Sequence, residues 1–218
     1  MRYKIVFFLL LSVIVFPSKM LAQDTIIYNQ TTGLLSIGDK IAYLKDEKNT
    51  FTIDDVLKSK DFINSKDAVP NMQITNSSYW IRFIVTNQSE LNNLALQLEY
   101  PTIDSVLVYT FDSTGVWTKA VTGEFVPYYT REHKHQNYIF NLHLAPGATH
   151  SYMMKVIASE QLQLPMTIGS TKNISEEIYT RDLLFGIYAG IILVMLLYNL
   201  FLYFSVRDRS YLYYVGYI

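Results

Sequence analysis

The sequence predicts a mainly β protein, an antiparallel β-sandwich of the jelly-roll type that is followed by a transmembrane α-helix and the start of a second one. Two observations predict this fold class. Apolar and polar residues alternate with a period of two in several short segments between residues 23 and 170, which is typical of half-buried strands. Residues 183–206 then contain no charged side chain, and such a run is long enough to cross a bilayer as a helix.

The composition excludes several classes of protein. The chain has 218 residues, 50% of them hydrophobic and 17% charged, and it contains no cysteine, which excludes disulfides, thiolate metal sites and cysteine nucleophiles. The formal net charge is -1 and no basic stripe is interleaved with aromatic residues, so a nucleic-acid partner is not expected. The sequence has no serine-triad order, phosphate-binding loop or zinc-protease motif. We therefore expect no enzymatic activity, no metal and no cofactor.

The first segment, residues 1–22, is expected to be a secretory signal peptide. Arg2 and Lys4 precede an apolar stretch, Ile5–Phe16, and Ala22 supplies a small residue at the expected cleavage point. The alternative is an uncleaved anchor, although the apolar stretch is short for a membrane span. Export would place residues 23–182 outside the cytoplasm.

Four segments of the exported part carry the alternation most clearly. In each of them the apolar residues occupy every second position, so one face of a strand would be buried and the other exposed. These segments are 81–85, 94–100, 138–144 and 162–168, and turn-forming clusters lie at 87–89, 112–115 and 146–147. Many short strands separated by turns are typical of a sandwich or jelly roll.

One short helix is expected to interrupt the strands. Thr52 precedes Asp55 by three residues, just before Val56 and Leu57, which resembles a capping box with Asp in place of the usual Glu. The helix should therefore begin at about residue 53.

Residues 171–182 are polar and are expected to connect the sandwich to the membrane helix. Within that helix, Gly186 and Gly190 form a small-xxx-small pair, and Asn199 introduces a polar group. Both features favour packing against another membrane helix. The alternative is that they occur by chance in a lone anchor.

A second apolar run follows the first after a very short interval. Residues 207–210 carry charge and are expected to form a cytoplasmic loop, and residues 211–218 are expected to begin a second, truncated membrane helix. On this interpretation the chain is the sensor end of a longer protein with several membrane helices.

Several stretches together resemble one family. They are "IAYLKDEKNTFTIDDVL" (41–57), "SSYWIRFIVTNQS" (77–89), "YPTIDSVLVYT" (100–110), "TGEFVPYYTREHKHQNYIFNLHLAPG" (122–147), "LPMTIGS" (164–170) and "GIYAGIILVMLLYNLFLYFSVRDRSYLYYVGYI" (186–218). These stretches resemble the bacterial seven-transmembrane receptors with diverse intracellular signalling modules, the 7TMR-DISM family. The first five are similar to the second extracellular domain type of that family, and the last to the start of its seven-helix region.

The resemblance implies a function as well as a fold. It implies a jelly-roll sensor domain in the periplasm that binds a carbohydrate or another small molecule, and a location in the bacterial inner membrane. It also implies a cytoplasmic output module, such as a histidine kinase or a nucleotide cyclase, which this chain does not contain.

Six side chains are candidates for ligand binding. Trp80 and Arg82 share one face of a predicted strand, where a ring to stack on a sugar would lie beside a planar donor for hydroxyl or carboxylate groups. The alternative is that Trp80 packs under a loop and Arg82 pairs with an acid. The remaining candidates are Asp104, Tyr109, Trp117 and Arg131.

Other readings of the same residues remain open. Trp117 follows a glycine turn and would equally close a hairpin. Arg131 opens the polar stretch 131–137, which is either a solvated loop or a loop that meets ligand. His133 and His135 have the spacing of two metal ligands, but no third ligand is evident nearby, so no metal is predicted.

The sequence therefore predicts the ligand-sensing, membrane-anchored part of a bacterial signal-transduction receptor. The alternative is a single-pass anchored β-sandwich that binds a partner or has a structural role, without signalling. The two differ in Gly186, Gly190 and Asn199, which matter in a helix bundle and not in a lone anchor.

Overall fold

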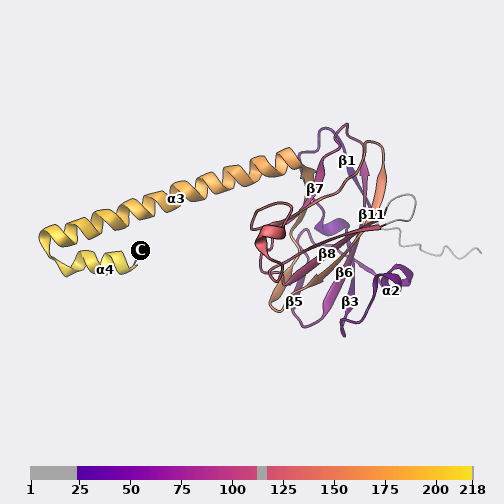
Figure 1. The fold of residues 1–218 in the computed structure, drawn as a ribbon, viewed down its shortest axis with the longest axis horizontal. Coiled ribbons are helices and arrows are strands. Elements are labelled where there is room, and N and C mark those ends of the chain that lie inside the picture. The colour runs from indigo at the N-terminus through magenta and orange to yellow at the C-terminus, as the bar shows by residue number, and fades with distance from the viewer. Residues whose placement is uncertain (1–23, 112–116, 218) are drawn as a thin grey trace, which may run out of the picture.

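The computed structural model describes residues 24–111 and 117–217, with the side chains of 117 and 118 excepted. The predicted signal peptide and the turn at 112–115 lie outside the described residues. Figure 1 shows a β-sandwich from which one long helix projects. The predicted mainly β, antiparallel class with a following membrane-length helix is confirmed: the described residues form 13 strands, nearly all paired antiparallel, followed by a long apolar helix, and the sheets that they form do not close into a barrel.

The larger sheet has seven strands. Its order is β4-β3-β6-β11-β8-β9, and β1 pairs with β6 in parallel. The strand β6 is long enough for two neighbours on one edge, because β3 pairs with its first half and β1 with its second. The strands are β1 (Thr25–Tyr28), β3 (Ala42–Asp46), β4 (Ile63–Asn64), β6 (Ser78–Asn87), β8 (Ser105–Phe111), β9 (Trp117–Thr122) and β11 (Thr149–Ile157).

The smaller sheet has four strands in the order β10-β7-β13-β2, and a separate pair joins β12 to β5. All of these pairings are antiparallel. The strands are β2 (Leu34–Ser36), β5 (Asn71–Ile74), β7 (Leu94–Leu98), β10 (Tyr138–Asn141), β12 (Gln161–Gln163) and β13 (Met166–Ser170).

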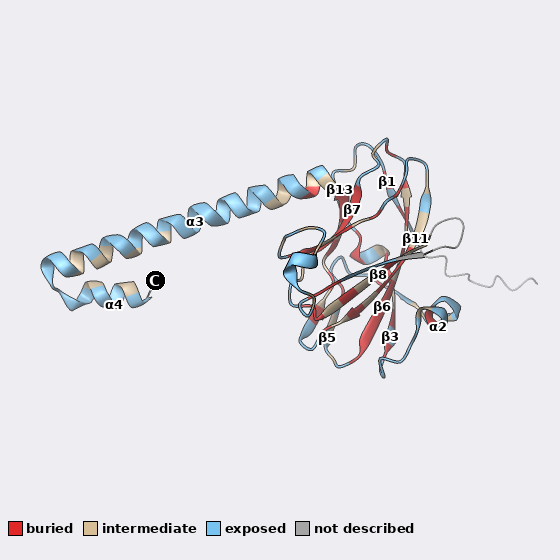
Figure 2. Ribbon diagram, viewed as in Figure 1, coloured by how far each residue is buried: buried red, intermediate tan, exposed pale blue. Residues whose placement is uncertain are grey.

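The core lies between the two sheets and follows the alternation of the sequence. Ile81, Phe83 and Val85 of β6 are all 0% exposed and belong to one cluster with the apolar residues of β7, β10 and β13. Figure 2 shows this burial as red strands inside the sandwich. The expected inward positions of β6 are therefore confirmed. On β7 the alternate residues Ala95 and Gln97 are 0% exposed as well, so this strand is covered on both faces.

The short helix α2 (Ile53–Lys58) begins as the sequence predicts. The Thr52 side chain accepts a hydrogen bond from the Asp55 amide, and the Asp55 carboxylate accepts one from the Thr52 amide, so the capping box is present. Val56 is fully buried against the outer face of the larger sheet. Two single turns of 3-10 helix complete the sandwich, η1 (Gly38–Lys40) and η2 (Tyr128–Thr130).

The helix α3 (Thr171–Val206) follows β13 with no residue between them. Ser170 caps it, because its hydroxyl accepts a hydrogen bond from the Asn173 amide at 3.0 Å. The stretch 171–182 is thus helical and continues the membrane helix outward. In Figure 2 the helix is exposed along almost its whole length, and it is the one described helix that is long and apolar enough to cross a membrane.

The chain reverses after α3. Arg207 has a φ of 57° in the left-handed region, and α4 (Arg209–Tyr217) turns back alongside the end of α3 (Figure 1). The non-helical interval is therefore Arg207–Asp208, shorter than the expected loop of 207–210.

The three residues expected to favour helix packing all lie within α3. A Cβ added at Gly186 or Gly190 would meet no described atom within 4 Å beyond its chain neighbours and the backbone of its own helix, and the Asn199 amide donates to the Met195 carbonyl at 2.8 Å within its own helix.

Candidate functional site

The structure brings three of the six candidate residues together on the outer face of the larger sheet. The cross-strand register places Arg82, Met153, Tyr109 and Lys119 in one row, because each is paired with the next on the neighbouring strand. Trp80 and Lys155 are paired in the adjacent row. We call this surface the sheet face, defined by Phe62, Trp80, Arg82, Tyr109, Phe111, Lys119 and Lys155.

Trp80 forms the floor of the sheet face. It is 1% exposed and packs with Leu44, Val56 and Met153 beneath α2, and its ring stacks on Tyr109 with 5.8 Å between centroids and 27° between planes. The indole ring therefore presents no face to solvent, and a sugar ring does not reach it without movement of α2. Tyr109 is 7% exposed, and burial raises the pKa of its hydroxyl.

Three cations lie over aromatic rings on this face. The Arg82 guanidinium is 4.3 Å from the centroid of Phe62, Lys119 Nζ is 5.9 Å from that of Tyr109, and Lys155 Nζ is 5.1 Å from that of Trp80. Burial lowers the pKa of Arg82. A surface that combines rings with cations suits a ligand that has an apolar face together with hydroxyl or carboxylate groups.

One buried carboxylate holds the edge of the sheet face. Asp46 is 1% exposed, accepts hydrogen bonds from the Phe51 amide at 2.9 Å and the Thr50 amide at 3.1 Å, and lies 3.6 Å from Lys155 Nζ. Burial acts to raise its pKa, but these amides, Lys155 and the Ser78 hydroxyl outweigh it, so the pKa of Asp46 lies below its ordinary value. Asp46 thereby fixes the Lys155 ammonium above Trp80.

The structure places two further candidates, Asp104 and Arg131, elsewhere. Arg131 lies within residues 123–137, which we call the junction loop, and Asp104 lies against the base of this loop. Arg131 donates to the His135 carbonyl and to the Gly123 carbonyl, each at 3.1 Å, and its guanidinium is 4.9 Å from the centroid of Tyr138. Asp104 is 7% exposed and accepts a hydrogen bond from the Ser159 hydroxyl at 3.2 Å. Arg131 thus holds the junction loop through its side chain, whereas the Asp104 side chain bonds to Ser159 outside the loop.

The loop also depends on one glycine. Gly123 has a φ of +142°, and a Cβ there would come within 2.3 Å of the Asp104 carbonyl oxygen. That carbonyl accepts a hydrogen bond from the Phe125 amide at 3.1 Å. The close approach of the two backbones requires the absence of a side chain at 123.

Trp117, the sixth candidate, begins β9 opposite Phe111. This pairing puts its backbone at the end of the sheet face, and its side chain lies outside the described part of the chain.

The junction loop meets the beginning of the membrane helix. The Arg181 guanidinium of α3 donates to the Glu99 carboxylate, which follows β7, at 2.8 Å, and His135 Nε2 lies 3.9 Å from Asp182 Oδ2. Burial lowers the pKa of His135, and the nearby Asp182 carboxylate opposes this only in part. A hollow between loop and helix is lined by Tyr128, Lys134, His135, Gln136, Arg181, Asp182 and Phe185.

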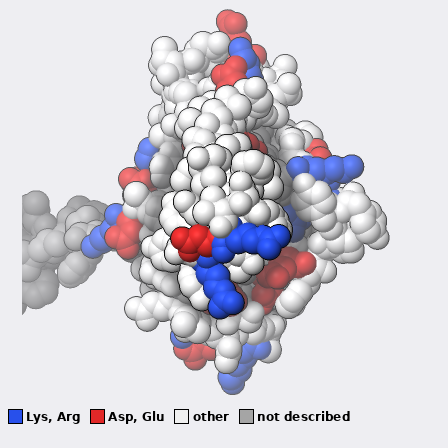
Figure 3. Space-filling view, turned by 90° about the vertical axis from the view of Figure 1, so that its left-hand side faces the viewer, with Lys and Arg blue, Asp and Glu red and all other residues white. Residues whose placement is uncertain are grey.

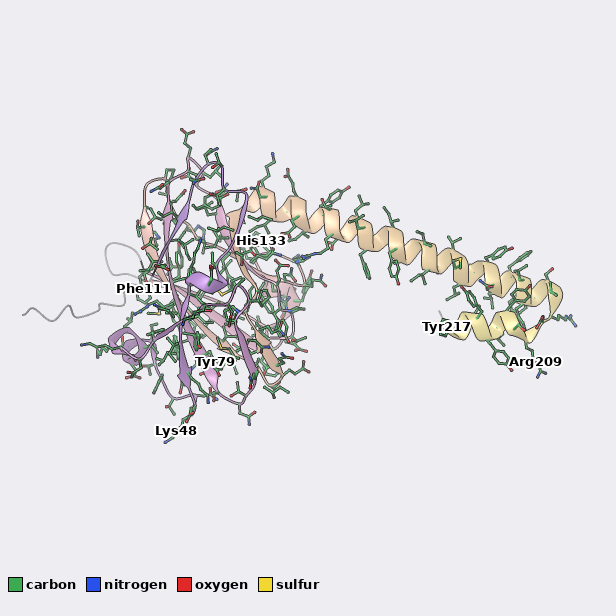
Figure 4. All side chains as sticks on the ribbon, turned by 180° about the vertical axis from the view of Figure 1, so that it is seen from behind. Lys48, Tyr79, Phe111, His133, Arg209 and Tyr217 are labelled. Carbon is green, nitrogen blue, oxygen red and sulfur yellow. The ribbon has the colours of Figure 1, made fainter. Side chains whose placement is uncertain are left out.

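The sheet face and the junction loop lie on different sides of the sandwich. Seen from behind, Phe111 of the sheet face is on the side away from α3, and His133 of the junction loop is on the side toward it (Figure 4). Figure 3, viewed from the side to which α3 points, looks along the helix and shows a small group of charged side chains where its far end faces the viewer. A ligand surface and a membrane junction are thus separated by the width of the sandwich.

Sequence reasoning missed several of these residues. On the sheet face it missed Asp46, Phe62 and Lys155, which pair with or cover residues far away in the sequence. At the junction it missed the pair of Glu99 and Arg181. The one available signal was the position of Arg181 just before the apolar run. Among the described residues no group of three or more His, Cys, Asp or Glu side chains could hold a metal ion.

Comparison with known proteins identifies the two parts of the chain. Residues 38–170 match the family described as 7TMR-DISM extracellular 2, and residues 181–218 match that described as 7TM diverse intracellular signalling. The chain belongs to the 7TMR-DISM family. It therefore contains the extracellular domain and the start of the membrane region of a sensory transmembrane receptor, as the resemblance in the sequence indicated.

Other comparisons add little. No curated protein matches the chain. One similar solved structure is described as "Structural basis for the promiscuous specificity of the carbohydrate-binding modules from the beta-sandwich super family", with 6% sequence identity and a TM-score of 0.28. The match covers 64% of this chain and 53% of that one, so the chain spans about half of its length. A likeness this distant carries no argument about the ligand.

Proposed function

We propose that this 7TMR-DISM chain is the ligand-sensing part of a bacterial signal-transduction receptor, in which the sandwich binds a small polar molecule and passes the bound state to α3. The observation that supports this proposal best is the direct join of β13 to α3, where Ser170 ends the strand and Thr171 begins the helix. Without a linker, the sandwich and the membrane helix cannot move independently.

The attachment is made at two levels of the helix. At its start the Thr171 amide donates to the Asn93 carbonyl at 2.9 Å, and Ile174 is 1% exposed. Ten residues later, about 15 Å along the helix axis, Arg181 is paired with Glu99. Two contacts this far apart fix the angle of the helix to the sandwich, so a change in the sandwich becomes a change in the position of the span.

The sheet face is the proposed ligand surface. Its rings and cations favour a carbohydrate, and among carbohydrates one with a carboxylate, because Arg82 and Lys119 present positive charge beside partly exposed Phe111. Signalling further requires that the ligand favour one of two arrangements of the domain relative to its helices.

The rest of the proposal follows the family. The chain has no catalytic role of its own, it resides in the bacterial inner membrane with residues 23–182 in the periplasm, and its output is a cytoplasmic kinase or cyclase. The alternative of a lone anchored sandwich is disfavoured by the match of residues 181–218 to a seven-helix region.

The test is ligand binding by the full chain in lipid nanodiscs, with a panel of neutral and acidic oligosaccharides and small metabolites measured by calorimetry. Lys119→Glu should weaken binding of the best ligand about tenfold or more, since one hydrogen bond to a charged group contributes roughly 1.5–3 kcal/mol. The matched control is Lys66→Glu, the same exposed charge reversal beside a different hollow. Equal loss in both variants, or no binding to any member of the panel by the folded protein, would count against the sheet face.

A further inference from the structure

Three large aromatic side chains project from the junction loop into solvent. Phe125 is 77% exposed, Tyr128 52% and Tyr129 78%. Isolated apolar residues are common on protein surfaces, but a group of large aromatic rings on one loop is typical of a site that contacts another apolar phase. These rings take no part in the core of the sandwich.

Their position relative to the membrane helix is fixed by the hollow described above. Tyr128 and Phe185 line the same hollow, and Phe185 is two residues, or about 3 Å, beyond Leu183, where the uncharged run begins. Figure 1 shows η2, which carries Tyr128 and Tyr129, on the side of the sandwich from which α3 projects. The loop therefore lies close to the level at which α3 enters the bilayer.

The loop is also held in shape before any contact is made. The Glu124 amide donates to the Ile103 carbonyl at 2.8 Å and the Phe125 amide to the Asp104 carbonyl at 3.1 Å, while the Thr130 hydroxyl donates to the Pro127 carbonyl at 2.7 Å. Arg131 ties both ends of the loop together. A loop with its backbone groups already paired loses little conformational entropy and exposes few polar groups when it enters an interface.

We propose that Phe125, Tyr128 and Tyr129 insert into the headgroup layer of the outer leaflet and dock the sandwich on the lipid surface. Tyrosine favours this region because its ring is apolar and its hydroxyl remains hydrated. Lys134, exposed in the same hollow, is placed to meet lipid phosphates. The occupant is lipid because the surface continues directly into the membrane-spanning face of α3. The inference does not depend on the nature of the ligand.

The docking gives the sandwich a second attachment to the membrane. The first is α3 itself, which joins the domain to the membrane region through one helix alone. Insertion of the loop beside α3 opposes rotation of the domain about that helix axis, so the sheet face would have one preferred orientation to the bilayer.

The chain contains no cysteine, so a single introduced cysteine can be labelled uniquely. Phe125→Cys and Tyr129→Cys variants of the full chain would be nitroxide-labelled in nanodiscs of phosphatidylethanolamine and phosphatidylglycerol. Electron paramagnetic resonance would then measure their collisions with oxygen, which enters lipid, and with a nickel chelate, which stays in water. Phe51→Cys is the control, because Phe51 is also exposed but lies beside α2, away from α3 (Figure 1).

Labels at 125 and 129 should have an oxygen-to-nickel collision ratio several-fold higher than the label at 51. Ratios equal to that at 51 would overturn the proposal. Labels at 125 and 129 that are shielded from both reagents would overturn it as well, because they would show that protein, rather than lipid, covers the loop. These residues are so exposed that the substitutions should leave the fold intact, which circular dichroism would verify.

Discussion

Removal of the Arg131 guanidinium should loosen the junction loop as a unit. In Arg131→Met the chain loses two hydrogen bonds, to the His135 and Gly123 carbonyls, while the methionine retains much of the packing against Tyr138. At the low end of the range for charged donors, which suits a partly exposed side chain, the two bonds contribute about 3 kcal/mol together. For a domain of this size that loss corresponds to a fall in apparent Tm of roughly 6–12 °C.

The measurement is thermal unfolding of the full chain in nanodiscs, together with hydrogen exchange of residues 123–137. Lys119→Met is the matched control, because Lys119 also lies over a tyrosine ring but belongs to β9 and not to the junction loop, and its exposed cation–π contact is worth about 0.5–1 kcal/mol. If Arg131→Met changes Tm no more than this control and exchange in the loop stays slow, Arg131 does not hold the loop together, and the account of the junction is refuted.

Three other outcomes are expected. Because the pKa of Asp46 is lower in the folded state than in the unfolded chain, the stability it confers is complete above about pH 4 and is lost as the pH falls through its folded pKa; Asp46→Asn should flatten this acid dependence in urea unfolding, and an unchanged curve would exclude the role of Asp46. Gln97→Leu should raise the free energy of unfolding by about 1–3 kcal/mol, since the amide of this 0% exposed side chain has no hydrogen-bond partner among the described residues; a loss of stability would reveal a hidden partner. In the complete receptor, Gly190→Leu should reduce signalling while a matched Val194→Leu on the same helix should not, and tolerance of both would favour the lone anchor.

Local patterns in the sequence predicted the features of the fold that depend on residues close together in the chain. The period-two alternation identified the inward residues of β6, because a strand between two environments must alternate, and Thr52 with Asp55 identified the start of α2. The uncharged run identified the membrane helix because a helix that crosses lipid must be apolar over a continuous stretch of residues.

Contacts between distant residues were not predicted. Nothing near Trp80 indicates that α2 will cover the outward face of β6, so its burial follows only from the fold. Arg181 and Glu99 are 82 residues apart, so no local pattern indicates that they form a pair. The parallel pairing of β1 with β6 likewise joins two strands that are distant in the sequence. The sequence indicated that Trp80 and Arg82 share one face of a strand. The position of Tyr109 beside them follows only from the fold, because β11 lies between β6 and β8.

The uninterrupted helix α3 also constrains the kind of movement that can reach the cytoplasm. If the rod pivots at the middle of its apolar run, near residue 194, its outer arm to Thr171 is about 35 Å long and its inner arm to Val206 about 18 Å. A sideways displacement of the outer end of such a helix is therefore reduced to about half at its inner end. Rotation about the helix axis and sliding along it are transmitted in full. A receptor built on this rod should thus respond to a twist or a piston stroke of its first helix more than to a tilt.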